Sequence, residues 1–323
     1  MRGPDYSVRP NNIKLKKLYC AKNQLINLDL SKNMELEELD CSENQLTNLN
    51  ISNNIELVEL KCNHNQLTSL DVSKNINLKN LHCFDNQLTN IDVTNNIDLS
   101  QLGCFNNPLT NLDVSNNINL ISLHCYNNQL TNLDISKNIK LEILDCYENK
   151  LSSLDISNNT KLTYLNCSYN ELTNLDISQS IRLEKLDCYK NQLNNLDIGN
   201  NIDLVYLNCF ENKLTNLDLN KSIKLEELHC YKNQLNNLDV SKNINLITIN
   251  CNNNQLNKLD VSKNTKLEEL YCNNNQLTRL DISPLPVLVK LNCCSQAEGF
   301  ILYLTNKQKS KFNDADYCDA ILQ

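Results

Sequence analysis

The chain has 323 residues, a formal net charge of −8 at pH 7, and no tryptophan. This acidic balance argues against a general binder of nucleic acids or of anionic membranes. No run of 18 apolar residues occurs, so we expect no segment that spans a membrane.

Residues 1–14 carry basic side chains but lack the apolar stretch of a signal peptide. We expect them to form an irregular lead-in to the rest of the chain. Two interpretations of the compartment stay open, because a cytoplasmic protein and a secreted protein without its original leader would both begin in this way.

Residues 15–287 consist of thirteen units of 21 residues that follow one another without insertion or deletion. The unit at 120–140, LISLHCYNNQLTNLDISKNIK, shows the pattern L-x-x-L-x-C-x-x-N-x-L, which is the signature of leucine-rich repeats. We number the coils from the one that starts at Leu15, and the positions within each coil from 1 to 21. Such coils contact mainly their neighbours, so the array predicts a solenoid rather than two globular domains.

Within coil 6, apolar residues two apart predict a short strand at 122–126 and a second extended segment at 133–135. Turns built on Asn128, Ser136 and Asn138 should separate these segments. Twenty-one residues leave little room for a helix. We therefore expect an α/β-class leucine-rich repeat horseshoe that consists mostly of β structure and turns, with a parallel β-sheet on its concave face.

Three polar or thiol columns recur with the repeat. The asparagine at position 9 should point inward and bond to the backbone of its own and the adjacent coil. The aspartate at position 15 should cap a turn, although its D-x-S-x-N spacing also leaves calcium binding open.

Fourteen of the 16 cysteines occupy position 6 of successive coils, and no C-x-x-C pair occurs. We interpret them as reduced, buried filler side chains, with redox or metal roles as the alternatives. Cys294 and Cys318 lie outside this column and could pair with each other.

Residues 288–323 should form a partial repeat and a C-terminal cap that shields the last hydrophobic coil. The fourteenth unit begins at Leu288 and loses its pattern after Cys293. We expect a strand at 300–304, and a second strand at 317–322 is an option.

The variable positions beside the strand carry all twelve aromatic side chains of the repeats and all four histidines. Cross-strand packing is one explanation, but the aromatic residues at position 7 are confined to the middle of the array, which favours an interaction surface. The candidate partner-binding residues are His82, Phe84, Phe105, His124, Tyr126, Tyr147, Tyr164, Tyr169, Tyr189, Tyr206, Phe210, His229 and Tyr231.

The unit L-x-x-L-x-C-x-x-N-x-L-T-x-L-D-V-S-x-N resembles the repeats of the internalin J-like class of bacterial leucine-rich repeat proteins. The resemblance implies secretion, a sheet-lined concave face, and adhesion or protein recognition at the cell surface. This chain departs from the class because it shows no signal peptide, no recognisable N-terminal cap and no LPxTG-type wall anchor.

We therefore predict a non-catalytic, monomeric recognition module that binds a protein through its concave face. Carbohydrate binding or adhesion is the alternative, because tyrosine and phenylalanine beside asparagine also suit sugars. No cofactor or metal site is predicted. No Ser-His-Asp or Cys-His pairing is predicted either, since the cysteines should face inward and the histidines outward.

Overall fold

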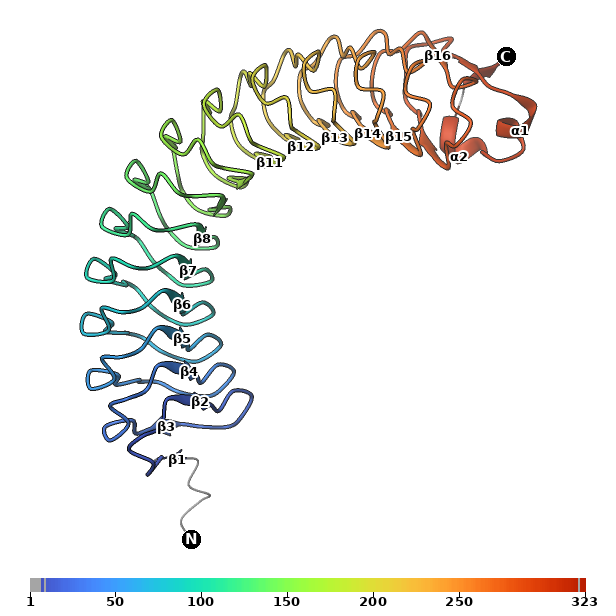
Figure 1. The fold of residues 1–323 in the computed structure, drawn as a ribbon. Coiled ribbons are helices and arrows are strands. Elements are labelled where there is room, and N and C mark those ends of the chain that lie inside the picture. Colours follow the sequence, from blue (N-terminus) through green and yellow to red (C-terminus); the bar gives the residue numbers. More distant parts are fainter. Residues whose placement is uncertain (1–6, 9, 319) are drawn as a thin grey trace. The chain divides into compact units, whose positions relative to one another are not determined.

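The computed structural model describes residues 7–8, 10–318 and 320–323. The chain divides into two compact units, one up to Lys161 and one from Leu162 onward, and each is described by itself. In both units every coil contributes one short strand to a parallel sheet, and these strands of successive coils lie side by side (Figure 1). The predicted leucine-rich repeat solenoid, mostly β structure and turns with little helix, is confirmed.

In the first unit, seven strands of coils 1 to 7 pair in parallel, with each residue opposite its equivalent in the next coil, as Leu102 is opposite Leu123. These strands are β2 (Lys17–Tyr19), β4 (Glu38–Asp40), β5 (Glu59–Lys61), β6 (Asn80–His82), β7 (Gln101–Gly103), β8 (Ser122–His124) and β9 (Ile143–Asp145).

In the second unit, seven strands of coils 8 to 14 pair in the same way, as Leu207 does with Leu228. They are β10 (Tyr164–Asn166), β11 (Lys185–Asp187), β12 (Tyr206–Asn208), β13 (Glu227–His229), β14 (Thr248–Asn250), β15 (Glu269–Tyr271) and β17 (Lys290–Asn292).

Short segments at the two chain ends add small sheets of their own. Near the N-terminus β1 (Ser7–Val8) pairs with β3 (Asn27–Leu28), so the lead-in is not wholly irregular. At the other end β18 (Ile301–Tyr303) lies between two strands. Those strands are β16 (Arg279–Asp281) and β19 (Ile321–Leu322). The short helices α1 (Asn306–Lys309) and α2 (Asp314–Tyr317) complete this end. Of the second strand considered at 317–322, only β19 forms among the described residues, and α2 ends at the first residue of that range.

The second extended segment of each coil is not a strand, except at β3 and β16, where a terminal segment lies beside it. Side chains bond to its backbone instead. Nδ2 of Asn138 donates to the carbonyl of Val114 in the preceding coil at 3.0 Å. Oδ1 of Asp134 accepts from the amide of Ser136 at 3.0 Å. The second contact confirms the predicted turn cap.

Leucine, isoleucine, valine and cysteine side chains fill the interior of each coil and are nearly all less than 8% exposed in coils 2 to 13. Asparagine at position 9 bonds successive coils together. Nδ2 of Asn128 donates to the carbonyls of Cys125 in its own coil and Cys104 in the preceding coil. Its Oδ1 accepts from the amide of Leu109 at 3.0 Å. The predicted role of this column is confirmed.

In the C-terminal cap, two glutamines take the roles that the position-9 asparagines and asparagines such as Asn138 have in the repeats. Nε2 of Gln308, which is 7% exposed, donates to the carbonyls of Ile282 at 2.7 Å and Leu285 at 3.0 Å. Oε1 of Gln296 accepts from the amide of Leu277 at 3.1 Å. The last coils therefore have their inner carbonyl and amide groups bonded, although the repeat pattern has ended.

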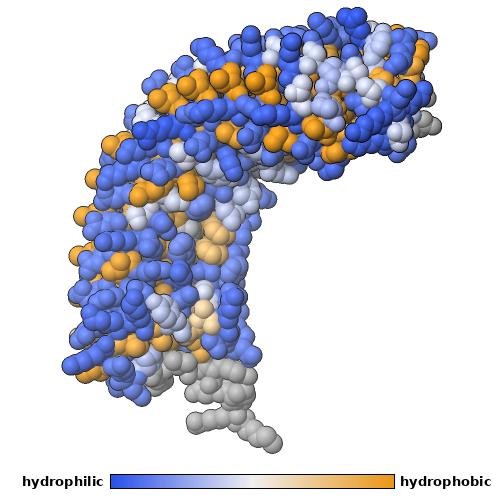
Figure 2. Space-filling view, turned by 45° about the vertical axis from the view of Figure 1, so that its right-hand side comes forward, coloured by the Kyte–Doolittle hydropathy of each residue, from blue (hydrophilic) through white to orange (hydrophobic). Residues whose placement is uncertain are grey.

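Exposed aliphatic side chains occupy position 20 of successive coils. Ile55, Ile76 and Ile97 in the first unit are 50–56% exposed, and Ile202 and Ile223 in the second unit are 53–55% exposed. Apolar patches accordingly recur from coil to coil on a mostly hydrophilic surface (Figure 2). The exposed apolar surface is thus not confined to the side of the coils that carries the strands.

Candidate functional site

The candidate site lies on the outward side of the parallel sheet, which we call the sheet face. Side chains alternate along a strand, so position 4 points inward and positions 3 and 5 point outward. In coil 6, Leu123 and Cys125 are 0% exposed, whereas His124 and Tyr126 are partly exposed. The thirteen candidate residues occupy positions 3, 5, 7 and 8 of their coils.

In the first unit, four rings at position 7 form one continuous stack, which we call the first ladder. Phe84 and Phe105 have ring centroids 4.1 Å apart, Phe105 and Tyr126 are also 4.1 Å apart, and Tyr126 and Tyr147 are 4.5 Å apart. The planes are within 14° of parallel. Each ring therefore covers the face of its neighbour and leaves mainly an edge for solvent.

In the second unit, Tyr189, Phe210 and Tyr231 form the second ladder, with centroid distances of 4.3 and 4.2 Å. Tyr169 meets Tyr189 edge to face at 5.4 Å. The ammonium group of Lys190 lies 4.2 Å from the Tyr169 ring centroid. Tyr169 is held at a positive φ of 49°, the conformation of every position-8 residue from coil 1 to coil 14.

Partial burial in the ladders changes the acidity of the tyrosines. Burial, with smaller contributions from Tyr147 and Asp145, raises the pKa of Tyr126 to about 12. Burial is also the main cause that raises the pKa of Tyr189 and of Tyr231. These phenols are therefore neutral hydrogen-bonding groups at physiological pH.

A row of histidines at position 5 runs beside the first ladder, interrupted by Gly103. A Cβ atom at Gly103 would lie 3.2 Å from Nδ1 of His82 and 3.5 Å from the Phe84 ring. The glycine thus leaves room for the His82 imidazole, whose pKa is lowered mainly by burial. In the second unit, His229 lies 5.8 Å from Tyr206, and Tyr164 is half-buried on β10.

One arrangement on this face differs from the sequence-based expectation that no Ser-His-Asp pairing exists. Oγ of Ser122 lies 2.9 Å from Nε2 of His124, and Nδ1 of His124 lies 3.8 Å from Oδ2 of Asp145. His124 and Asp145 both occupy position 5, in coils 6 and 7, so the 21-residue spacing was a signal of this contact that the sequence-based expectation did not use. Ser122 is only 9% exposed, and the amides of Ser122 and Cys125 donate to sheet carbonyls, so no oxyanion-binding pair is formed by them.

His64 was not among the candidate residues, yet its ring contacts the end of the first ladder. Its ring meets Phe84 edge to face at 5.3 Å, and its Nδ1 lies 3.3 Å from Oδ2 of Asp85. Position 8 of one coil contacts positions 7 and 8 of the next. That cross-coil relation was the signal available in the sequence.

The cysteines at position 6 form a column inside the coils, away from the sheet face. Thirteen of the fourteen free thiols are buried, and Cys20 is partly exposed. Burial raises the pKa of Cys83 and of Cys167 to about 12. Cys294 and Cys318 form a disulfide, as considered from the sequence.

Across residues 7–8, 10–318 and 320–323, histidine, cysteine, aspartate and glutamate form no group of three placed to hold a metal ion. Helices in the same part of the chain are all too short or too polar to cross a lipid bilayer.

The coil geometry, the parallel sheet and the buried cysteine column define a leucine-rich repeat solenoid with a cysteine ladder. The chain is similar to the functional domain of InlJ from Listeria monocytogenes, a structure that includes a cysteine ladder. The two share 37% identity with a TM-score of 0.84, and the match covers 90% of this chain and 64% of the InlJ chain. The predicted resemblance to the internalin J-like class is thereby confirmed, and this chain spans less than two thirds of that structure's length.

Other solved structures share the fold at lower identity. The leucine-rich repeat protein LIC12759 of Leptospira interrogans is 24% identical with a TM-score of 0.80, and the match covers 98% of this chain and 92% of that one. The LRIM1/APL1C complex gives 20% identity and a TM-score of 0.72, over 88% of this chain and 60% of that one. No protein-family model and no curated protein matches the sequence.

Proposed function

We propose that this chain is a non-catalytic recognition module that binds a protein partner through the sheet face. The observation that carries the proposal is the pair of aromatic ladders, half-exposed just beyond the ends of the strands and flanked by histidine, aspartate and asparagine side chains. Aromatic anchors with a polar surround are the usual composition of protein interfaces. The LRIM1/APL1C structure is itself a complex, which supports a binding role for this fold.

The stacking favours a protein over a carbohydrate as the partner. Sugars bind aromatic side chains by lying across the ring face, but in each ladder most ring faces are covered by the adjacent ring at 4.1–4.5 Å. The exposed ring edges and tyrosine hydroxyls instead suit hydrogen-bonding and apolar groups of an extended peptide or a protein surface. Carbohydrate binding at the ladders is therefore the second candidate.

We further propose that the module works at a cell surface, as the internalin J-like resemblance implies. The disulfide between Cys294 and Cys318 supports this location, because such bonds persist in oxidising compartments.

The proposal is tested by replacing Tyr126 on the sheet face with a photo-cross-linking amino acid. In a control chain, Lys137 in an outer turn is replaced instead. Both chains are exposed to surface-protein extracts of the producing organism and of the cells it contacts. We expect a protein that cross-links from position 126 and not from position 137. Equal capture by both chains, or capture by neither together with retention on a glycan array, would contradict a protein-binding sheet face.

A further inference from the structure

A second candidate site lies on the flank of the second unit, away from the sheet face, where the repeat changes composition. Position 13 is neutral in coils 1 to 11 and becomes Lys258 and Arg279 in coils 12 and 13. The eleven neutral residues are Asn27, Asn48, Ser69, Asn90, Asn111, Asn132, Ser153, Asn174, Asn195, Asn216 and Asn237. Neither fold nor core requires the two cations, because eleven coils form without them.

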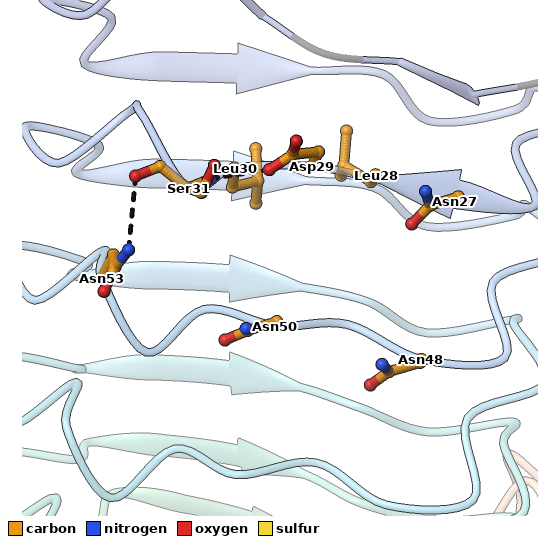
Figure 3. Close-up of a pocket in the computed structure, with 8 residues that line it drawn as sticks. All are labelled: Asn27, Leu28, Asp29, Leu30, Ser31, Asn48, Asn50 and Asn53. Carbon is orange, nitrogen blue, oxygen red and sulfur yellow. Dashed lines mark hydrogen bonds between the residues drawn. The ribbon is translucent and has the colours of Figure 1, made fainter.

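Lys258 and Arg279 line a cleft of about 440 Å³ together with Asp260, Asp281 and Tyr303. The equivalent groove between coils 1 and 2 has only about 190 Å³ and is lined by asparagines at the matching places (Figure 3). The enlarged cleft falls within the 300–1,000 Å³ range that is typical of small-molecule sites.

Tyr303 forms one wall of this cleft because the C-terminal cap continues the coil. Strand β18 pairs with β16 so that Tyr303 lies opposite Asp281. An aromatic side chain thus stands at the place where another coil would carry the next aspartate of the position-15 column. The cleft consequently combines cations, carboxylates and a half-buried phenol.

The charged groups of the cleft are available to a ligand. Lys258 and Arg279 are exposed, and within the described residues neither forms an ion pair. Oδ1 of Asp281 accepts from the amide and hydroxyl of Ser283 at 2.9 and 2.6 Å. Both contacts are made to the same carboxylate oxygen.

We propose that this cleft binds an acidic saccharide. A bare anion would be attracted by Lys258 and Arg279 but repelled by the two carboxylates beside them. A sugar acid satisfies both sets of groups, because its carboxylate can bond to the guanidinium and ammonium groups while its hydroxyls donate to Asp260 and Asp281. The apolar C–H face of the sugar ring can then lie against Tyr303. The site is independent of the protein-binding sheet face.

The test is isothermal titration of the full chain with three probes: digalacturonate, the neutral disaccharide lactose, and sodium sulfate. We expect saturable binding of digalacturonate alone. The double variant Lys258→Asn/Arg279→Asn installs the residue found at position 13 of most coils and should lower the affinity by about tenfold or more. Tyr303→Leu should weaken binding as well.

A matched control removes the same two charges elsewhere, as Lys221→Asn/Lys242→Asn at position 18, where asparagine also recurs. This control should bind like the parent. The proposal is overturned by absent digalacturonate binding, by equal binding of sulfate or lactose, or by unchanged affinity in the Lys258→Asn/Arg279→Asn variant. A loss of affinity in the control as large as in that variant would show that net charge alone is responsible, and would overturn it too.

Discussion

Asn128 illustrates how one side chain stabilises two coils at once. Its amide group donates to the carbonyls of Cys125 and Cys104, and its oxygen accepts from the buried amide of Leu109. Replacing it with alanine leaves these backbone groups without partners in an interior that water does not reach.

We therefore expect Asn128→Ala to lower the free energy of unfolding by about 3 kcal/mol, from unsatisfied groups that cost about 1–3 kcal/mol each. Urea unfolding followed by circular dichroism measures this change. The control Asn132→Ala alters an exposed asparagine at position 13 and should change stability by less than about 0.5 kcal/mol. Equal losses of unfolding free energy in the two variants would show that the hydrogen bonds of the position-9 asparagines do not stabilise the fold.

The cysteines at position 6 differ from ordinary thiols because burial raises their pKa above the usual value of 9.0. For Cys167 the pKa rises to about 12. A thiol reacts as its thiolate, so the reactivity of an exposed cysteine rises with pH up to its pKa, whereas a buried one stays protonated and shielded. Burial raises the pKa of Cys20 as well, to about 11, but this thiol is partly exposed. From pH ~7 to pH ~9.5 the native chain should therefore react at Cys20 at most, and slowly, whereas the unreduced, denatured chain should react at all fourteen free thiols. Counting modified cysteines by mass spectrometry checks this. Native reaction at many sites in that range would refute a buried, reduced column.

At the scale of single elements, the strands and the asparagine column were predictable because both repeat with the 21-residue period. The second extended segment was predicted from the same apolar spacing, which does not reveal how its backbone groups are bonded. Its backbone groups are instead bonded by side chains, such as Asn138 and Asp134, and this competition is not visible in hydrophobic periodicity.

The C-terminal cap could be predicted only in outline, because it has no repeat. Gln308 lies 26 residues after Ile282 and on a different element, yet its side chain donates to the carbonyl of Ile282. Such a contact depends on the path of an irregular loop. The same reason applies to Tyr303, whose position in the cleft follows from the pairing of β18 with β16.

The first coil is the least buried element of its stack. Leu15, Leu18 and Cys20 are partly exposed, whereas their equivalents in coil 2, such as Leu39 and Cys41, are 0–1% exposed. Among the described strands, β2 has a sheet neighbour on one side only. Solenoid ends with less coverage open more readily than the interior.

Hydrogen–deuterium exchange should therefore be fastest in coil 1 and slower in β6 to β8 of the same unit, since terminal opening needs fewer contacts to break. Peptide-resolved mass spectrometry measures the difference. Equal protection of β2 and β7 would mean that the lead-in covers the first coil more fully than these contacts indicate.

Along the repeat array, the sequence predicted which positions carry aromatic side chains, but it did not predict how the rings are arranged. Periodicity placed Phe105 and Tyr126 one coil apart, and only the structure shows them stacked at 4.1 Å. The same applies to His124 and Asp145, which adjacent coils bring together. Side chains of neighbouring coils adjust to one another, and this adjustment decides which ring surfaces are left for a partner.

The most direct test of the sheet-face proposal is the dissociation constant of the partner identified by cross-linking from position 126, measured for two double variants. Tyr126→Ala/Tyr147→Ala removes half of the first ladder, and Lys137→Ala/Asn158→Ala changes two exposed outer-turn residues. The loss of stacking should reduce stability by about 1–3 kcal/mol in the tyrosine variant, so circular dichroism first confirms that both variants are folded.

Truncating a buried aromatic anchor commonly costs about 2 kcal/mol or more, roughly thirtyfold in affinity. We predict that the folded tyrosine variant binds at least about thirtyfold more weakly than the parent, while the outer-turn variant binds like the parent. Retained affinity in the tyrosine variant together with lost affinity in the outer-turn variant would contradict a binding site on the sheet face.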